Sequence, residues 1–172
     1  MTDACQCPPQ AGSSTCGLRS TAPKTKAACP TNGQVGKSVD VMTVKALLAV
    51  PLTQLSQREY HFCRAAGCPT VYFSTDGSQI LGEGDLRERV YQKHPNDDDV
   101  FGCYCFYHTI GSIREELART GSSTVVAAIT AGIQAGQCAC EIRNPQGSCC
   151  LGNVRAIVQR LEPEFVKTSN EK

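Results

Sequence analysis

Cys103-Tyr104-Cys105 opens the stretch that decides the fold, and Cys138-Ala-Cys140-Glu-Ile-Arg-Asn-Pro-Gln-Gly-Ser-Cys149-Cys150 closes it. This stretch, residues 101–158, holds six of the twelve cysteines of the 172-residue chain. Two segments between the cysteine groups have the apolar pattern of amphipathic helices. A hairpin of these helices would bring the two groups together, and four thiolates are the ligand set of an iron–sulfur cluster.

Capping residues and apolar spacing place the helices of this stretch. Thr109 is predicted to cap the first helix and Gly121 to end it, while Ser123 is predicted to cap a second helix that Gly136 ends. An antiparallel hairpin of the two returns the second cysteine group to the first. A third helix is predicted to begin at Cys149-Cys150. Its predicted buried face consists of Val154, Ile157, Val158 and Leu161.

Composition and charge give no sign of a nucleic-acid partner, a membrane partner or secretion. The formal net charge is +1 and no tryptophan is present, so bulk electrostatics do not predict binding to nucleic acid or to a membrane surface. The first residues lack the charged and apolar regions of a signal peptide, and no apolar run is long enough to span a membrane. We therefore expect a cytoplasmic protein without membrane insertion, whose clustered cysteines stay reduced and bind metal rather than form disulfides.

Residues 1–28 are rich in Ser, Thr, Pro, Ala, Gly and Lys and are predicted to be a disordered tail. Cys5, Cys7 and Cys16 lie in this tail. Cys5 and Cys7 either bind a soft cation such as Cu(I), for which thiolates are the preferred ligands, or are incidental thiols on a linker. Residues 163–172 are predicted to form a second disordered tail.

A zinc site is predicted from Cys29, Cys63 and Cys68, which follow the layout of a small fold stabilised by a thiolate-bound metal. Cys29 begins the sequence Cys-Pro-Thr-Asn-Gly, a cysteine knuckle in which Asn32 stands where a second cysteine is expected. Cys63 and Cys68 lie between two predicted strands. The candidates for the fourth ligand are Asn32, His61, a tail cysteine, of which Cys16 is nearest, and water.

The predicted elements around the zinc site are short. A strand over residues 38–43 precedes a helix over residues 44–50, for which Thr43 is the predicted cap. Strands follow over residues 59–62 and 69–73, Asp76-Gly77 marks a hairpin turn, and further extended pieces lie near residues 80–81 and 89–91. The predicted fold class is α+β. It comprises a zinc-stapled β-rich domain over residues 29–93, a linker over residues 94–100 and a small helical [2Fe–2S] domain over residues 101–162.

On these motifs the chain resembles a known family. Residues 101–158 look like the [2Fe–2S] domain of bacterioferritin-associated ferredoxin, in which a C-x-C precedes a helical hairpin and the last ligand begins the final helix. The spacing from Cys140 to Cys150 is similar to that in the amino-terminal region of CopZ-type copper chaperones of archaea and bacteria, where a zinc-binding domain precedes such a cluster domain. Cys63-x4-Cys68 followed by Thr-Val-Tyr-Phe, with Cys29-Pro30 before it, is similar to that zinc domain. The resemblance covers residues 29–161.

The resemblance implies two sets of metal ligands. Cys103, Cys105, Cys140 and Cys150 would hold a [2Fe–2S] cluster, and Cys29, Cys63 and Cys68 would hold Zn²⁺. Cys150 is chosen over Cys149 because the helical period that begins at Cys150 reaches the apolar residues of the third helix. Cys138 and Cys149 are then spare thiols, either inert or able to bind a passing metal ion.

Complete CopZ-type chaperones continue into a ferredoxin-like heavy-metal domain with an M-x-C-x-x-C motif. The 172 residues contain no such motif. Copper would therefore have to bind the tail thiols or the spare cysteines.

The sequence favours a metallochaperone that couples one-electron transfer to the handling of a soft metal ion such as Cu(I). Its expected partner is a metal-trafficking or redox protein, for example a copper transporter. The alternative is a regulatory or docking module with a structural or redox-sensing cluster and no metal transfer. No nucleophile lies at catalytic spacing from a base, so we expect no enzyme activity beyond electron transfer or metal reduction. His108 could replace a cluster ligand as in Rieske centres, but with four thiolates present we interpret it as a helix-entry residue.

Overall fold

The computed structural model describes residues 26–166. Four short strands form an antiparallel sheet in the order β1-β2-β3-β4. They are β1 Lys37–Val39, β2 Tyr60–Phe62, β3 Thr70–Ser74 and β4 Ile80–Gly82. Gly77, with a φ of 70°, lies in the predicted turn between β3 and β4. The extended piece predicted near residues 89–91 is not a strand.

Helix α1, Val41–Leu47, packs with the sheet around a core that includes Val44, Tyr60 and Tyr72. The predicted cap and start of this helix were wrong. Asp40 is the N-cap, because its carboxylate accepts a hydrogen bond of 2.8 Å from the backbone amide of Met42. Thr43 therefore lies inside the helix and is fully buried. Two short 3-10 helices, η1 Leu52–Gln54 and η2 Glu83–Asp85, complete this half.

The second half begins with a two-stranded hairpin and continues as helices. Its elements are β5 Phe101–Cys103, β6 His108–Thr109, α2 Ile110–Thr120, α3 Val125–Gln134, α4 Cys140–Arg143 and α5 Leu151–Val166. Thr109 caps α2 as predicted, since its hydroxyl accepts the Ser112 amide at 3.0 Å. Thr124, not Ser123, is at the N-cap position of α3, and its hydroxyl donates to Glu116 instead of capping the helix. Helices α2 and α3 both pack against α5.

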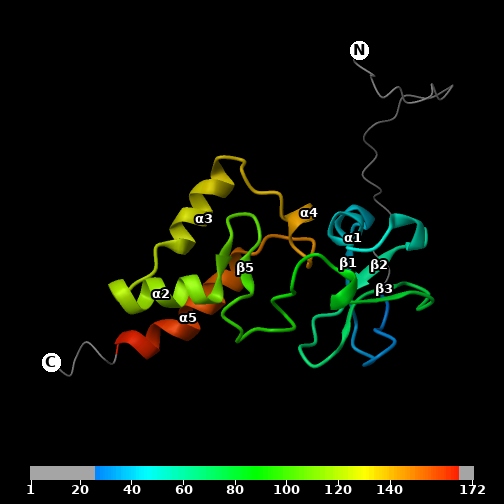
Figure 1. Ribbon diagram of the computed structural model, residues 1–172, viewed down its shortest axis with the longest axis horizontal. Helices are drawn as coiled ribbons and strands as arrows, with labels where there is room; N and C mark the ends of the chain where they lie inside the picture. Colours follow the sequence, from blue (N-terminus) through cyan, green and yellow to red (C-terminus); the bar gives the residue numbers. More distant parts are fainter. Residues whose placement is uncertain (1–25, 167–172) are drawn as a thin grey trace, which may run out of the picture.

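Each half of the molecule has its own apolar core, and α4 lies between the halves (Figure 1). The sheet and α1 form one side of the molecule, and α2, α3 and α5 form the other. Helix α4 packs against α1. Because α4 begins at Cys140, one of the predicted cluster ligands lies where the two halves meet. None of the helices in residues 26–166 combines the length and the apolar character needed to cross a membrane.

Candidate metal centres

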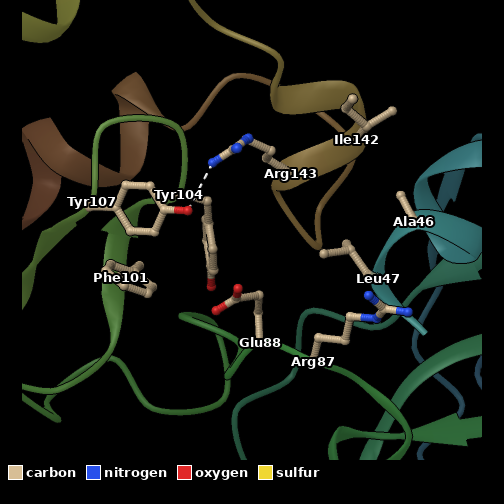
Figure 2. A pocket seen from close by; sticks show the side chains of 9 residues that line it. All are labelled: Ala46, Leu47, Arg87, Glu88, Phe101, Tyr104, Tyr107, Ile142 and Arg143. Carbon is tan, nitrogen blue, oxygen red and sulfur yellow. Dashed lines mark hydrogen bonds between the residues drawn. The ribbon is translucent and has the colours of Figure 1, made fainter. Parts of the chain in front are cut away.

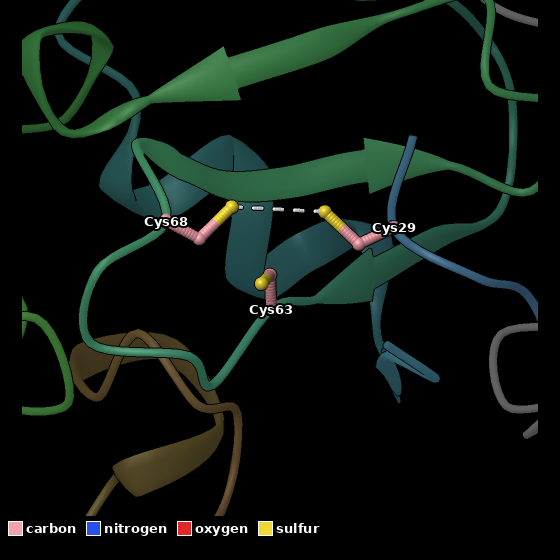
Figure 3. A group of neighbouring side chains, drawn as sticks. All are labelled: Cys29, Cys63 and Cys68. Atoms are coloured by element: carbon pink, nitrogen blue, oxygen red, sulfur yellow. Dashed lines mark hydrogen bonds between the residues drawn. The ribbon is translucent and has the colours of Figure 1, made fainter. Parts of the chain in front are cut away.

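Three cysteines from separate segments of the first half point toward one another (Figure 3). Cys29 precedes a tight turn, Cys63 follows β2 and Cys68 precedes β3. Their Sγ atoms all lie within 4.8 Å of one another, and those of Cys29 and Cys68 are 3.9 Å apart. Two thiolates on a tetrahedral zinc ion, with bonds of about 2.3 Å, would be about 3.8 Å apart. The spacing of the three buried sulfurs therefore fits tetrahedral zinc.

The surroundings of these thiols favour a thiolate on Cys29. Burial raises the pKa of the Cys29 thiol, but the nearby backbone of Thr31 and Asn32 and the sulfurs of Cys63 and Cys68 lower it by more, so the net pKa is lowered. Burial raises the pKa of Cys63, while the Ala65 amide and the charge of Lys93 oppose that rise. A metal cation bound to the three buried sulfurs would add the positive charge needed to keep them all as thiolates.

Of the predicted candidates for a fourth zinc ligand, Asn32 lies beside the sulfurs and His61 does not. The Nδ2 of Asn32 donates to Cys63 Sγ at 3.4 Å, and its Oδ1 accepts the Gln34 amide at 3.0 Å. His61 is fully buried in β2 and stacks on Phe73, with ring centroids 5.5 Å apart. It is not part of the group formed by the three sulfurs. Cys16 lies outside the described residues.

A second cysteine group lies in the other half. The Sγ atoms of Cys103 and Cys150 are 3.1 Å apart, those of Cys150 and Cys140 are 4.0 Å apart, and those of Cys140 and Cys105 are 3.6 Å apart. Cys103, Cys140 and Cys150 are buried, and Cys105 is half-buried. The structure thus brings together the four cysteines predicted as cluster ligands. Each cysteine of the described residues is free of a disulfide.

The remaining cysteines of the two motifs lie nearer the surface. Cys138 is half-buried and Cys149 is exposed. Cys150 directly precedes α5 and is buried, as its predicted helical register requires. His108 lies in β6 opposite Cys103, and burial lowers its pKa. Cys5 and Cys7 lie outside the described residues.

The four thiols differ in pKa: two of them ionise more readily than a free cysteine, and two ionise less readily. Hydrogen bonding with Cys150 lowers the pKa of Cys140 to about 5 and that of Cys103 to about 7. Burial raises the pKa of Cys105 to about 12, although the Ala139 amide donates to its sulfur at 3.3 Å. The pKa of Cys150 is raised by the same sulfur contacts. The group therefore loses its first protons readily, while its full deprotonation requires a cation.

Side chains of the first half hold the backbone of the loop that carries Cys140 and Cys150. Tyr72 donates to the Pro145 carbonyl at 2.6 Å, and Thr43 donates to the Glu141 carbonyl at 2.5 Å. Lys37 Nζ donates to the Gln146 carbonyl at 2.8 Å. Sequence reasoning missed these contacts, because they join residues between 73 and 109 positions apart and match no local motif.

Buried contacts also position the Cys103-Tyr104-Cys105 segment. The Tyr104 hydroxyl donates to the Arg89 carbonyl at 2.8 Å and accepts the Tyr91 amide at 2.9 Å. Phe106 packs closely on Gly132 of α3: a Cβ atom at this glycine would lie 2.4 Å from the Phe106 ring. The contacts of Tyr104 and Phe106 therefore position the C-x-C segment.

Two known proteins or families are similar to this chain. Residues 26–87 match the family model zf_CopZ, described as a zinc binding domain. This part of the chain is therefore similar to a CopZ-type zinc binding domain. The structure is also similar to the X-ray structure of the Archaeoglobus fulgidus CopZ N-terminal domain. The two are 26% identical, with a TM-score of 0.63, and the match covers 76% of this chain and 96% of that one. No curated protein matches the sequence.

The matched residues 26–87 contain Cys29, Cys63 and Cys68, and the three-sulfur group agrees with the zinc binding for which the family model is named. The predicted α+β fold is confirmed by the structure and by the likeness to the CopZ N-terminal domain. The assignment of individual cysteines as ligands stays a prediction.

A cavity of about 220 Å³ lies between the first half and the helical half of the molecule (Figure 2). Its rim includes Arg143 and Tyr107, which are joined by a hydrogen bond of 3.0 Å from Nη1 to the tyrosine hydroxyl. Tyr107 is 60% exposed and has a φ of 57°, a strained conformation for an aromatic residue. The cavity adjoins the second cysteine group, because Tyr107 follows Cys105 by two positions. Its lining contains no cysteine, so it is not itself a thiolate site.

Proposed function

We propose that this CopZ-like metal-handling protein is a metallochaperone that carries zinc at Cys29, Cys63 and Cys68 and a [2Fe–2S] cluster at Cys103, Cys105, Cys140 and Cys150. The observation that carries the proposal is the chain of four sulfurs, linked by separations of 3.1, 4.0 and 3.6 Å within one core. We assign zinc to a domain over residues 29–93 and the cluster to a domain over residues 101–162, joined by residues 94–100.

The donor set fits the proposed cluster. Four thiolates are the usual protein ligands of a [2Fe–2S] centre, which supplies one-electron chemistry when bound. The pKa values of Cys140 and Cys103, lowered to about 5 and about 7, favour anionic sulfur. The Ala139 amide, which donates to Cys105 Sγ, stabilises negative charge on this less buried ligand.

Residues around the second centre control access to it. The buried thiols of Cys103, Cys140 and Cys150 are shielded from solvent, whereas Cys105 and the half-buried Cys138 face the more open side. Electrons would therefore leave or enter on the side of Cys105. Copper handling would fall to Cys138, Cys149 or the tail thiols, since thiolates are the ligands that Cu(I) prefers.

Metal and sulfide analysis of the anaerobically purified chain tests the proposal. We expect about two iron and two sulfide per chain, with an electron paramagnetic resonance signal after one-electron reduction. Cys105→Ser and Cys150→Ser should lose the visible absorption of the cluster, while the control variants Cys138→Ser and Cys149→Ser should retain it. Loss in Cys149→Ser with retention in Cys150→Ser would refute the ligand assignment. A cluster that cannot be reversibly reduced would refute the electron-transfer role.

A further inference from the structure

Asn32 contacts the sulfur of Cys63 in the first centre, at the position where the sequence motif leads us to expect a cysteine. Its side-chain Nδ2 donates to Cys63 Sγ at 3.4 Å. No other His, Cys, Asp or Glu of residues 26–166 joins the three cysteines in this group. The Asn32 carboxamide therefore marks one corner of the site, beside Cys63.

The Asn32 side chain is oriented so that it cannot bind zinc. Its Oδ1 accepts the backbone amide of Gln34 at 3.0 Å, the turn-forming bond typical of asparagine. This bond turns the NH₂ group toward the sulfurs, and an amide NH₂ group has two donors and no lone pair suited to a metal. Rotating the amide to present its oxygen would leave the Gln34 amide facing another donor. Asn32 thus stabilises the thiolate of Cys63 but adds no ligand.

The Asn32 corner is also accessible. Asn32 and Gly33 are exposed, whereas the three cysteines are no more than 5% exposed. An added Cβ at Gly33, the next residue, would meet no atom within 4 Å, so the chain is not crowded beside Asn32. A ligand from outside could reach the fourth corner by displacing an exposed carboxamide and without disturbing the buried sulfurs.

We infer that the zinc centre has an open fourth coordination position and that an external thiolate binds there. The inference rests on the proposed binding of zinc by Cys29, Cys63 and Cys68. Structural zinc sites have four protein ligands, whereas sites with three protein ligands keep a position for water or for an incoming ligand. The incoming thiol releases its proton to solvent, and its sulfur replaces the bound water. The Asn32 NH₂ group and Lys93, whose charge acts on Cys63, offset the added negative charge.

Zinc K-edge X-ray absorption of the full chain in thiol-free buffer tests the inference, because it counts the sulfur ligands of zinc whether or not iron is bound. We expect three sulfurs at about 2.3 Å and one lighter atom at about 2.0 to 2.1 Å. Excess β-mercaptoethanol should convert this to four sulfurs. Asn32→Ala should behave as the wild type, and Asn32→Cys should show four sulfurs with and without the thiol.

Three results would overturn the inference. Four sulfurs in thiol-free wild type, falling to three when Cys5, Cys7 and Cys16 are replaced by serine, would show that a tail cysteine fills the position. An unchanged wild-type spectrum after thiol addition would show that the position is closed. A difference between the spectra of Asn32→Ala and wild type in thiol-free buffer would show that Asn32 is a ligand. Zinc without sulfur neighbours would instead refute the proposed zinc ligands themselves.

Discussion

Replacing Tyr72 with phenylalanine should loosen the loop that carries Cys140 and Cys150. The Tyr72 side chain is fully buried in β3, and its hydroxyl donates to the buried Pro145 carbonyl at 2.6 Å. Tyr72→Phe keeps the ring and its packing but leaves this carbonyl without its donor. An unsatisfied buried acceptor costs about 1 to 3 kcal/mol. At about 2 kcal/mol, the population of an opened loop would rise by about 30-fold.

Tyr60→Phe is the matched control. Tyr60 is equally buried, on the neighbouring strand β2, but its hydroxyl bonds to Ser56 and Gln79, neither of which belongs to the loop. Both variants should lose similar unfolding free energy in urea titrations. Only Tyr72→Phe should accelerate iron loss to a chelator, by up to about 30-fold, and increase hydrogen exchange at residues 141–149. Equal rates of iron loss and equal exchange in the two variants would refute the reasoning.

Three further changes test other parts of the fold. Gly132→Ala places a Cβ atom 2.4 Å from the Phe106 ring and should lower the unfolding free energy by about 1 to 3 kcal/mol, whereas Gly152→Ala, which meets nothing within 4 Å, should not lower it; urea titration compares them. Burial raises the pKa of Glu116, but hydrogen bonds from Thr124 and Ser123 lower it by more. The pKa of Glu116 in the folded protein therefore lies below that in the unfolded chain. Its contribution to stability is present above about pH 4.5 and is lost as the pH falls through the folded pKa, so Glu116→Gln should flatten the loss of stability in acid; equal pH profiles of the two proteins would contradict this. Chelation of zinc should lower the unfolding temperature in calorimetry, because Cys29, Cys63 and Cys68 join three separate segments; an unchanged temperature would contradict a stabilising metal.

Local signals predicted the second cysteine group well. The helical period counted from Cys150 depends only on residues within the next few turns, and the structure places Val154, Ile157, Val158 and Leu161 on the buried face. The Thr109 cap and the Gly121 end of α2 were likewise predictable, since both depend on the adjoining turn. These local features fix which cysteines meet.

Two kinds of feature could not be predicted from the sequence: the choice between neighbouring cap residues, and contacts between residues far apart in the chain. Thr43 and Asp40 are both good caps, and only the structure shows that Asp40 captures the Met42 amide and leaves the Thr43 hydroxyl for a carbonyl 98 residues away. The polar composition of residues 94–100 predicted a linker. In the structure, His94 contacts Glu83 of the first half, and Asp98 contacts Arg114 of the second. The composition of residues 94–100 does not reveal whether their charged side chains are solvated or contact other charged side chains.

The arrangement of the halves explains how the two centres can influence each other. Cys68 lies two residues before β3, which carries Tyr72, and Tyr72 holds the loop between Cys140 and Cys150. Gly147 in this loop lies so close to Thr43 that a Cβ atom there would be 3.2 Å from the threonine hydroxyl, so the loop has little room to shift. Tyr72 of β3 therefore links the segment that carries Cys68 to the backbone between Cys140 and Cys150. Because Thr43 and Lys37 also donate hydrogen bonds to this backbone, side chains of the first half hold the loop of the second cysteine group in place.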